Sequence, residues 1–152
     1  LINDVFEMLK PLADAKELEM VVDCDRAPEK VLTDPLRLQQ IITNLLGNAI
    51  RYTELGAIQL TCQILSDNDW SIAVSDTGIG MTPENQPYIF DPFFRVGDSD
   101  SYLPDSTGLG LAIVSQLVKL MQGKIELVSQ LGIGSTFTVI LPLEVKTIES
   151  VI

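Results

Sequence analysis

Histidine is absent from the 152 residues, and cysteines, aromatic residues and cations are few. Without histidine the chain lacks the commonest metal ligand and the commonest general base. This excludes a serine triad, a Cys–His pair and a zinc-hydrolase site. Acid–base chemistry must therefore come from carboxylates or from another chain.

The charge balance is strongly acidic, with 10 Lys and Arg against 21 Asp and Glu and a formal net charge of −11. This charge repels phosphate backbones, and five Phe, three Tyr and one Trp offer few platforms for base stacking. We therefore expect no nucleic-acid binding. An anionic small ligand would need local cations or a metal ion.

The two cysteines, Cys24 and Cys62, lie in apolar runs without CxxC spacing, which favours buried thiols in a reducing compartment such as the cytoplasm. The chain has no run of about 18 apolar residues and no signal-peptide pattern, so no direct membrane contact is expected. Its length and its 46% hydrophobic content predict one globular domain. A helical pattern is already in phase at Ile2, so we expect a piece of a longer protein.

Hydrophobic periodicity predicts an α/β fold. Helices are expected at 3–17, 35–53 and 108–123, and strands at 18–24, 58–64, 70–76, 124–129 and 135–141. A short helix should begin at Thr82-Pro83. Residues 95–107 contain Gly, Pro and few apolar residues, so we expect a mobile loop there. This order favours a two-layer sandwich, in which a mixed, mostly antiparallel sheet is covered on one face by helices.

Two polar features have competing interpretations. Asn44 and Asn48 lie one turn apart at the edge of the apolar face of helix 35–53, either as polar boundary residues or as oxygen ligands for Mg²⁺ and phosphate-bound water. Asp76 shares the core-facing side of its strand with Ile72 and Val74. Its carboxylate is either bonded within an Asp-x-Gly turn or available to an adenine amino group.

The remaining candidates are individually weak. Gly108-Leu109-Gly110 is either a hinge or an anion site at a helix N-terminus. Phe90, Phe93 and Phe94 either anchor the core or form the hinge of a lid. Arg51 and Arg95 are either solvated charges or cations beside a triphosphate.

The order of these motifs along the chain resembles the sensor histidine kinase catalytic domain of the GHKL ATPase superfamily, over nearly the whole length. The N, G1, F, G2 and G3 boxes of that family correspond to Asn44-x-x-x-Asn48, Asp76-x-Gly78-x-Gly80, Phe90-x-x-Phe93-Phe94, Gly108-x-Gly110 and Gly132-x-Gly134-Ser-Thr-Phe. The resemblance implies the Bergerat fold with bound ATP and Mg²⁺. It also implies a domain core at about 1–143, an ATP lid at 95–107 and a tail at 144–152.

The resemblance also implies roles for individual residues. Asn48 would carry Mg²⁺ and the triphosphate, and Asn44 would help to form that site. Arg51 would contact phosphates, and Tyr52 would line the nucleotide cleft. The implied catalytic residues are Asn48, Arg51 and Arg95.

Adenine recognition would fall to Asp76, which would accept the amino group, with Gly78 and Gly80 admitting the base. Thr136 would lie near the adenine end. The implied ATP-binding set is completed by Phe94, Thr107, Gly108, Leu109, Gly110 and Leu111.

Two departures from the family pattern qualify this expectation. The lid has no Lys and has Ser106 where an additional glycine is common, so lid closure would be weak without a partner. Hydrolytic relatives such as gyrase place a catalytic Glu where this chain has Asn44, which cannot act as a base. We therefore expect ATP binding with poor hydrolysis.

The resulting hypothesis is a protein-histidine kinase domain that transfers the ATP γ-phosphate to a histidine on a separate dimerisation domain. A response-regulator aspartate would then take the phosphate. The intact protein would be a homodimer and the isolated domain a monomer. An anti-sigma-type protein-serine kinase and a non-catalytic nucleotide-sensing module remain as alternatives.

Overall fold

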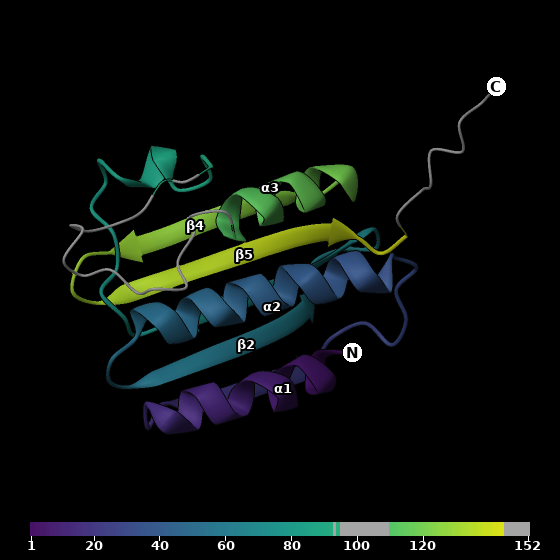
Figure 1. The fold of residues 1–152 in the computed structure, drawn as a ribbon. Coiled ribbons are helices and arrows are strands. Elements are labelled where there is room, and N and C mark those ends of the chain that lie inside the picture. Colours follow the sequence, from purple (N-terminus) through teal and green to yellow (C-terminus); the bar gives the residue numbers. More distant parts are fainter. Residues whose placement is uncertain (93, 95–109, 145–152) are drawn as a thin grey trace.

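The computed structural model describes residues 1–92, 94 and 110–144. Their elements, in chain order, are α1 (Ile2–Ala15), β1 (Glu19–Arg26), α2 (Pro35–Tyr52), β2 (Ala57–Ile64), β3 (Asp69–Asp76), the 3-10 helix η1 (Gln86–Tyr88), α3 (Gly110–Leu120), β4 (Lys124–Gln130) and β5 (Gly134–Pro142). Figure 1 shows α2 lying between α1 and α3 across the sheet. Helix and strand positions thus agree closely with those expected from periodicity.

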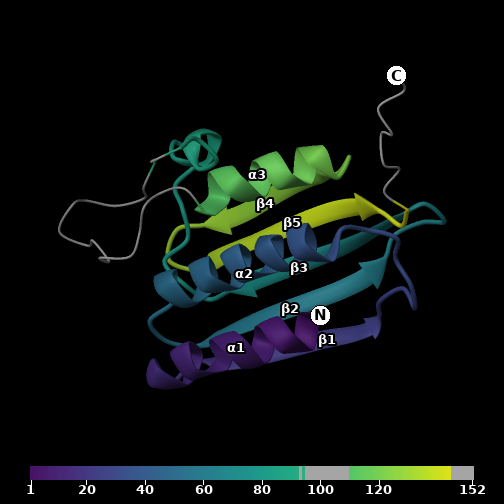
Figure 2. The same ribbon diagram turned by 45° about the vertical axis from the view of Figure 1, so that its right-hand side comes forward.

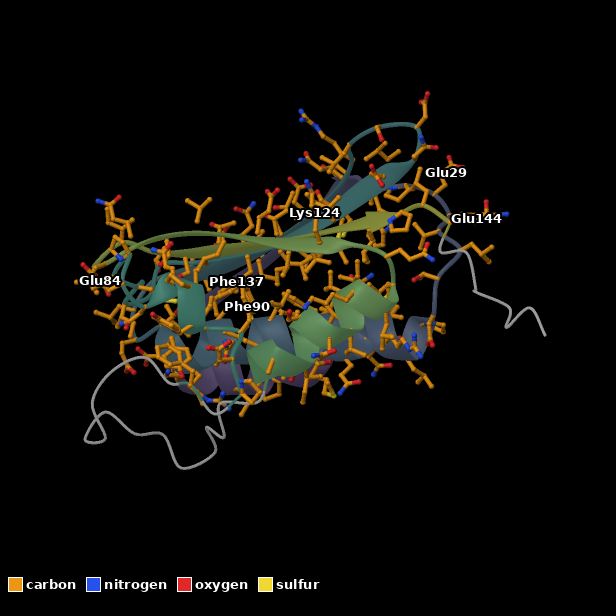
Figure 3. All side chains as sticks on the ribbon, turned by 90° about the horizontal axis from the view of Figure 1, so that it is seen from above. Glu29, Glu84, Phe90, Lys124, Phe137 and Glu144 are labelled. Atoms are coloured by element: carbon orange, nitrogen blue, oxygen red, sulfur yellow. The ribbon has the colours of Figure 1, made fainter. Side chains whose placement is uncertain are left out.

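The strands form one mixed sheet in the order β1-β2-β3-β5-β4. β1 and β2 are parallel, and the other neighbouring pairs are antiparallel. The views in Figures 2 and 3 show the helices on one face of the sheet, with no described helix on the other. The predicted two-layer α/β sandwich and both predicted hairpins are confirmed.

Helix α2 begins at a strong capping signal. The Asp34 carboxylate accepts hydrogen bonds from the backbone N–H groups of Leu36 and Arg37 at 3.0 and 3.3 Å, and Pro35 starts the helix without needing an amide partner. The apolar face of the helix then packs on the sheet. Fully buried side chains of this contact include Ile41, Ile42, Leu45, Leu46, Ile58, Leu60, Ile72 and Val74. This burial fixes which side of α2 carries its polar residues.

The two cysteines are free thiols on neighbouring strands, as expected for core residues. Cys62 is fully buried and Cys24 is half-buried. Burial, with a smaller contribution from Cys24, raises the pKa of the Cys62 thiol. The thiol therefore stays protonated and unreactive.

The segment after β3 differs from the prediction. Thr82-Pro83 begins a turn rather than a helix, and η1 starts only at Gln86. The backbone bonds here span three residues, including Asn85 N–H to the Thr82 carbonyl at 3.1 Å and Tyr88 N–H to the Asn85 carbonyl at 3.1 Å. Pro87 has no N–H to donate to residue 83, so an α-helical ladder cannot continue through it.

Candidate functional site

The exposed edge of α2 presents a row of polar side chains. Asn44 and Asn48 are half-buried, one turn apart, and flanked by the buried Leu45 and Ala49. Arg51 follows in the last turn, with its Nη1 3.5 Å from the Asn48 Oδ1 that accepts from it. Two amide oxygens and one guanidinium therefore lie along one edge of the helix.

The start of α3 lies beside this row. A Cβ placed on Gly110 would lie 3.7 Å from the Asn44 Oδ1, which is ordinary van der Waals contact. The first backbone N–H groups of a helix have no partner within it and form its positive end. The structure thus brings the N-terminal end of α3 together with the amide row of α2.

Asp76 ends β3 on the side of the sheet that faces the helices, as the alternation predicts. Its Oδ1 accepts the Gly78 N–H at 2.9 Å, so the Asp-x-Gly turn is formed. Burial raises the pKa of the Asp76 carboxyl, and the backbone amides of Gly78 and Ser135 partly offset this effect. A carboxylate has about four acceptor positions, so these amides leave capacity for a further donor.

The glycines near Asp76 are required by contacts within the chain. A Cβ on Gly78 would collide with the Tyr52 carbonyl and lie 2.9 Å from the Asp76 Oδ1. Gly80 has a φ of +66° and packs against the Gln130 carbonyl. The Ile79 N–H also donates to the Tyr52 carbonyl at 3.3 Å. The loop after β3 is therefore docked on the end of α2, which brings Tyr52 near Asp76.

Thr136 does not join these residues. It pairs with Ser75, and the two hydroxyl oxygens are 2.8 Å apart on the sheet face away from the helices. Successive residues of a strand point to opposite faces, so the Thr136 side chain and the Asp76 carboxylate lie on different faces of the sheet. The expected role of Thr136 near the adenine end stays a prediction. The β5 residue on the Asp76 side is Ser135, which pairs with Asp76 in register.

Ser135 was not among the predicted site residues, although the alternation of β5 places it on the face that the helices cover. It has the same parity as the buried Phe137, Val139 and Leu141 of β5. Its hydroxyl is buried and lies 2.8 Å from the Ser129 Oγ, which also accepts the Met81 N–H at 2.8 Å.

The aromatic motif serves the core in the described residues. The Phe90 and Phe137 rings meet edge to face with centroids 6.2 Å apart, and both side chains are labelled in Figure 3. Phe94 is partly buried against the core, with its ring centroid 6.0 Å from that of Tyr88. Leu111 is likewise partly buried against the core. These contacts favour the interpretation of Phe90 and Phe94 as core anchors.

Several expected site residues lie outside the described residues. These are Phe93, Arg95, Thr107, Gly108 and Leu109, together with the rest of the expected lid at 95–107.

The donor set fits a magnesium ion shared with a phosphorylated ligand. Within residues 1–92, 94 and 110–144, no group of three or more Cys, Asp or Glu side chains could hold a metal ion. Asn48 instead offers an amide oxygen that accepts one long hydrogen bond, from the Arg51 Nη1 at 3.5 Å. Mg²⁺ commonly takes one or two protein oxygens and completes its shell with phosphates and water.

The comparisons with known proteins agree with this geometry. The family described as histidine kinase-, DNA gyrase B- and HSP90-like ATPase matches residues 33–145. The chain belongs to this family. Its resemblance to the histidine kinase branch is also confirmed, since the sensor histidine kinase RcsC of Escherichia coli K12 is 42% identical over 144 residues, which are 93% of this chain and 15% of RcsC.

Other relatives of this ATPase domain give the same result. The autoinducer 2 sensor kinase/phosphatase LuxQ of Vibrio cholerae is 34% identical over 95% of this chain and 17% of its own length. Full-length ShkA, solved in complex with AMPPNP, superposes with a TM-score of 0.83 at 33% identity, covering 93% of this chain and 29% of ShkA. The catalytic domain of histidine kinase ThkA superposes with a TM-score of 0.80 at 26% identity, covering 94% of this chain and 92% of that domain.

This histidine kinase-like ATPase domain spans less than a fifth of the length of the curated relatives RcsC and LuxQ. Among its described helices, none combines the length and the apolar character that a membrane crossing requires.

Proposed function

We propose that this chain binds Mg·ATP and presents the γ-phosphate to a histidine on a dimerisation domain outside the chain. The observation that carries the proposal is the meeting of the Asn44–Asn48–Arg51 row with the start of α3 at Gly110, on the same side of the sheet as Asp76. This arrangement pairs a phosphate-binding end with a base-binding end. The relatives named as sensor histidine kinases and the AMPPNP complex of ShkA support the same function.

Base recognition rests on Asp76 in this proposal. Its carboxylate would accept a hydrogen bond from the adenine amino group, a donor that guanine lacks at this position. The hydrogen bond from the Gly78 amide at 2.9 Å orients the carboxylate before the base arrives. Tyr52, beside the same loop, would line the cleft.

Phosphate binding rests on α2 and α3. Asn48 would hold Mg²⁺, with Asn44 beside it, and the ion would neutralise phosphate charge. Arg51 would place a guanidinium on the phosphates, and the amides at the start of α3 would donate to them. Arg95, Thr107, Gly108 and Leu109 remain part of the proposed set. Such positive groups are required because the chain carries a net charge of −11.

Transfer requires positioning more than covalent help from the protein. The acceptor imidazole nitrogen would bond to the γ-phosphorus while the bond from that phosphorus to the bridging oxygen breaks and ADP leaves. The sequence of α2, PLRLQQIITNLLGNAIRY, contains no carboxylate that could activate water. We therefore expect slow hydrolysis in the absence of the acceptor.

The test is transfer of label from γ-labelled ATP to a histidine-bearing dimerisation domain supplied in trans. We expect labelling by the unvaried chain and by Gln40→Ala, an exposed amide on the same helix. Asn48→Ala should lose most of the labelling. Equal labelling by Asn48→Ala would contradict the kinase assignment.

The chemistry of the labelled product separates the alternatives. Phosphohistidine is lost in acid and survives base, whereas phosphoserine behaves in the opposite way. Acid-stable label would favour a protein-serine kinase, and ATP binding without any labelled product would favour a nucleotide-sensing module. A response-regulator receiver domain added afterwards should remove the label from the histidine.

A further inference from the structure

We propose that Lys16, at the end of α1, is a positioning residue for Arg51 in the nucleotide site. This inference rests on the proposed function, because it concerns how the ATP-binding end of α2 is held. Lys16 lies before the segment that matches the family, which is residues 33–145.

The Lys16 ammonium group binds the end of α2 directly. Its Nζ donates to the carbonyl of Ile50 at 2.8 Å and to the carbonyl of Arg51 at 3.2 Å. It also lies 3.6 Å from the Glu54 carboxylate, which is 78% exposed and so adds little. The two carbonyl contacts therefore dominate this interaction.

These carbonyls are groups that the helix itself leaves unpaired. The last four carbonyls of an α-helix have no partner within it, and they form its negative end. The Lys16 ammonium group donates to the carbonyls of Ile50 and Arg51, and the Ile79 N–H donates to the carbonyl of Tyr52. The last turn of α2 is thus held from two separate parts of the chain.

Backbone hydrogen bonds close the end of α1 around Lys16. The N–H groups of Glu17 and Leu18 donate to the carbonyls of Asp14 and Ala13, each at 2.9 Å. Ala13 and Leu18 on either side are buried, and Glu17 takes a left-handed conformation with a φ of +57°. Such closure of the helix end fixes the direction in which the Lys16 side chain leaves α1.

The consequence reaches the site through Arg51. The same residue whose carbonyl accepts from Lys16 carries the guanidinium that donates to Asn48 at 3.5 Å. Loss of Lys16 would free the last turn to fray and would let Arg51 leave the amide row. Nucleotide affinity would then fall without any change in a group that touches the nucleotide.

The experiment measures binding of AMPPNP with Mg²⁺ by calorimetry in the full chain. Lys16→Met should weaken binding by about 2- to 30-fold, the range found for residues that act at a distance. Lys16→Arg, which keeps the charge and the donors, should restore affinity. Lys10→Met is the matched control, because Lys10 is exposed on the same helix and makes no hydrogen bond or ion pair within the described residues.

A double-mutant cycle separates positioning from a general charge effect. In an Arg51→Met background, Lys16→Met should change affinity by less than about twofold, because the group that it positions is gone. Hydrogen exchange should also accelerate selectively at the Arg51, Tyr52 and Thr53 amides. If Lys16→Met does not fold, Lys16→Gln, which keeps a neutral donor, replaces it in the cycle.

Three results would overturn the inference. One is unchanged affinity of Lys16→Met, and another is an equal loss in both backgrounds, which would indicate a direct effect of charge. Both leave the proposed function intact as long as the unvaried chain binds the nucleotide. Failure of the unvaried chain to bind would instead contradict the proposed function and this inference together.

Discussion

Replacing Asp76 with Asn separates the binding role of this carboxylate from its effect on stability. The substitution preserves the size of the side chain and an oxygen that can accept the Gly78 N–H, now 2.9 Å from the Asp76 Oδ1. It removes the negative charge. If the Asn oxygen keeps the hydrogen bond from Gly78, the Asn NH2 group faces the position of the adenine amino group. Both groups are donors, so no hydrogen bond can form between them.

The size of the binding effect follows from the bond that is lost. A hydrogen bond to a charged group contributes about 1.5 to 3 kcal/mol. With 1.4 kcal/mol for each factor of ten, Asp76→Asn should weaken ATP binding by roughly 10- to 150-fold. Asp69→Asn, at the other end of β3, should leave affinity unchanged.

Calorimetric titration with AMPPNP and Mg²⁺ measures this change directly. An affinity of Asp76→Asn within twofold of the unvaried chain would refute the role of Asp76 in base recognition. An equal loss in Asp69→Asn would show that the effect comes from total charge and not from the position.

Although Asp76→Asn should weaken ATP binding, it should raise the stability of the folded chain at neutral pH. Because burial raises the Asp76 pKa, the folded chain binds this proton more tightly than the unfolded chain. The resulting stabilisation is complete below the ordinary carboxyl pKa and is lost as the pH rises through the raised value. Asp76→Asn should therefore unfold at a higher temperature than the unvaried chain at neutral pH, with the difference shrinking toward about pH 4. A lower unfolding temperature at neutral pH would contradict this reasoning.

Two further predictions concern packing, and denaturant unfolding measures both. Gly78→Ala should lose about 1 to 3 kcal/mol, because its Cβ meets the Tyr52 carbonyl, whereas Gly47→Ala, with open space around its Cβ, should gain up to about 1 kcal/mol. Equal effects of the two changes would exclude the close contact as the cause. Leu60→Ala, 1% exposed in the core, should lose about 2 to 5 kcal/mol while the folded protein keeps its nucleotide affinity. A parallel loss of affinity would show that the core and the site are coupled.

The fold was predictable because each element carries a local signal. Asp34-Pro35 marks the start of α2, and alternation marks both hairpins. The prediction of a helix beginning at Thr82-Pro83 was wrong because Pro87, which prevents an α-helix here, lies beyond the residues that signal a helix start. The alternation of β5 places Thr136 on the face opposite to the buried Phe137, so its side of the sheet could also be read from the sequence.

The remaining features of the site depend on contacts between distant residues. The sequence indicates that Gly78 and Gly80 are special, but the collisions that require them involve Tyr52 and Gln130. Likewise, Lys16 is an ordinary cation at the end of a helix until α1 is placed beside the end of α2. Periodicity assigns residues to faces, whereas these pairings arise only when the layers are assembled.

The outermost position of β1 also bears on self-association. Its sequence, EMVVDCDR, places charges along the free edge of the sheet, and a register shift between Asp23 and Arg26 distorts that edge. Both features discourage pairing with strands of other molecules. β2, AIQLTCQI, has no charged residue and would become the edge if the chain began at residue 33, where the family match begins. The first two elements therefore protect the ATPase core from aggregation through its sheet.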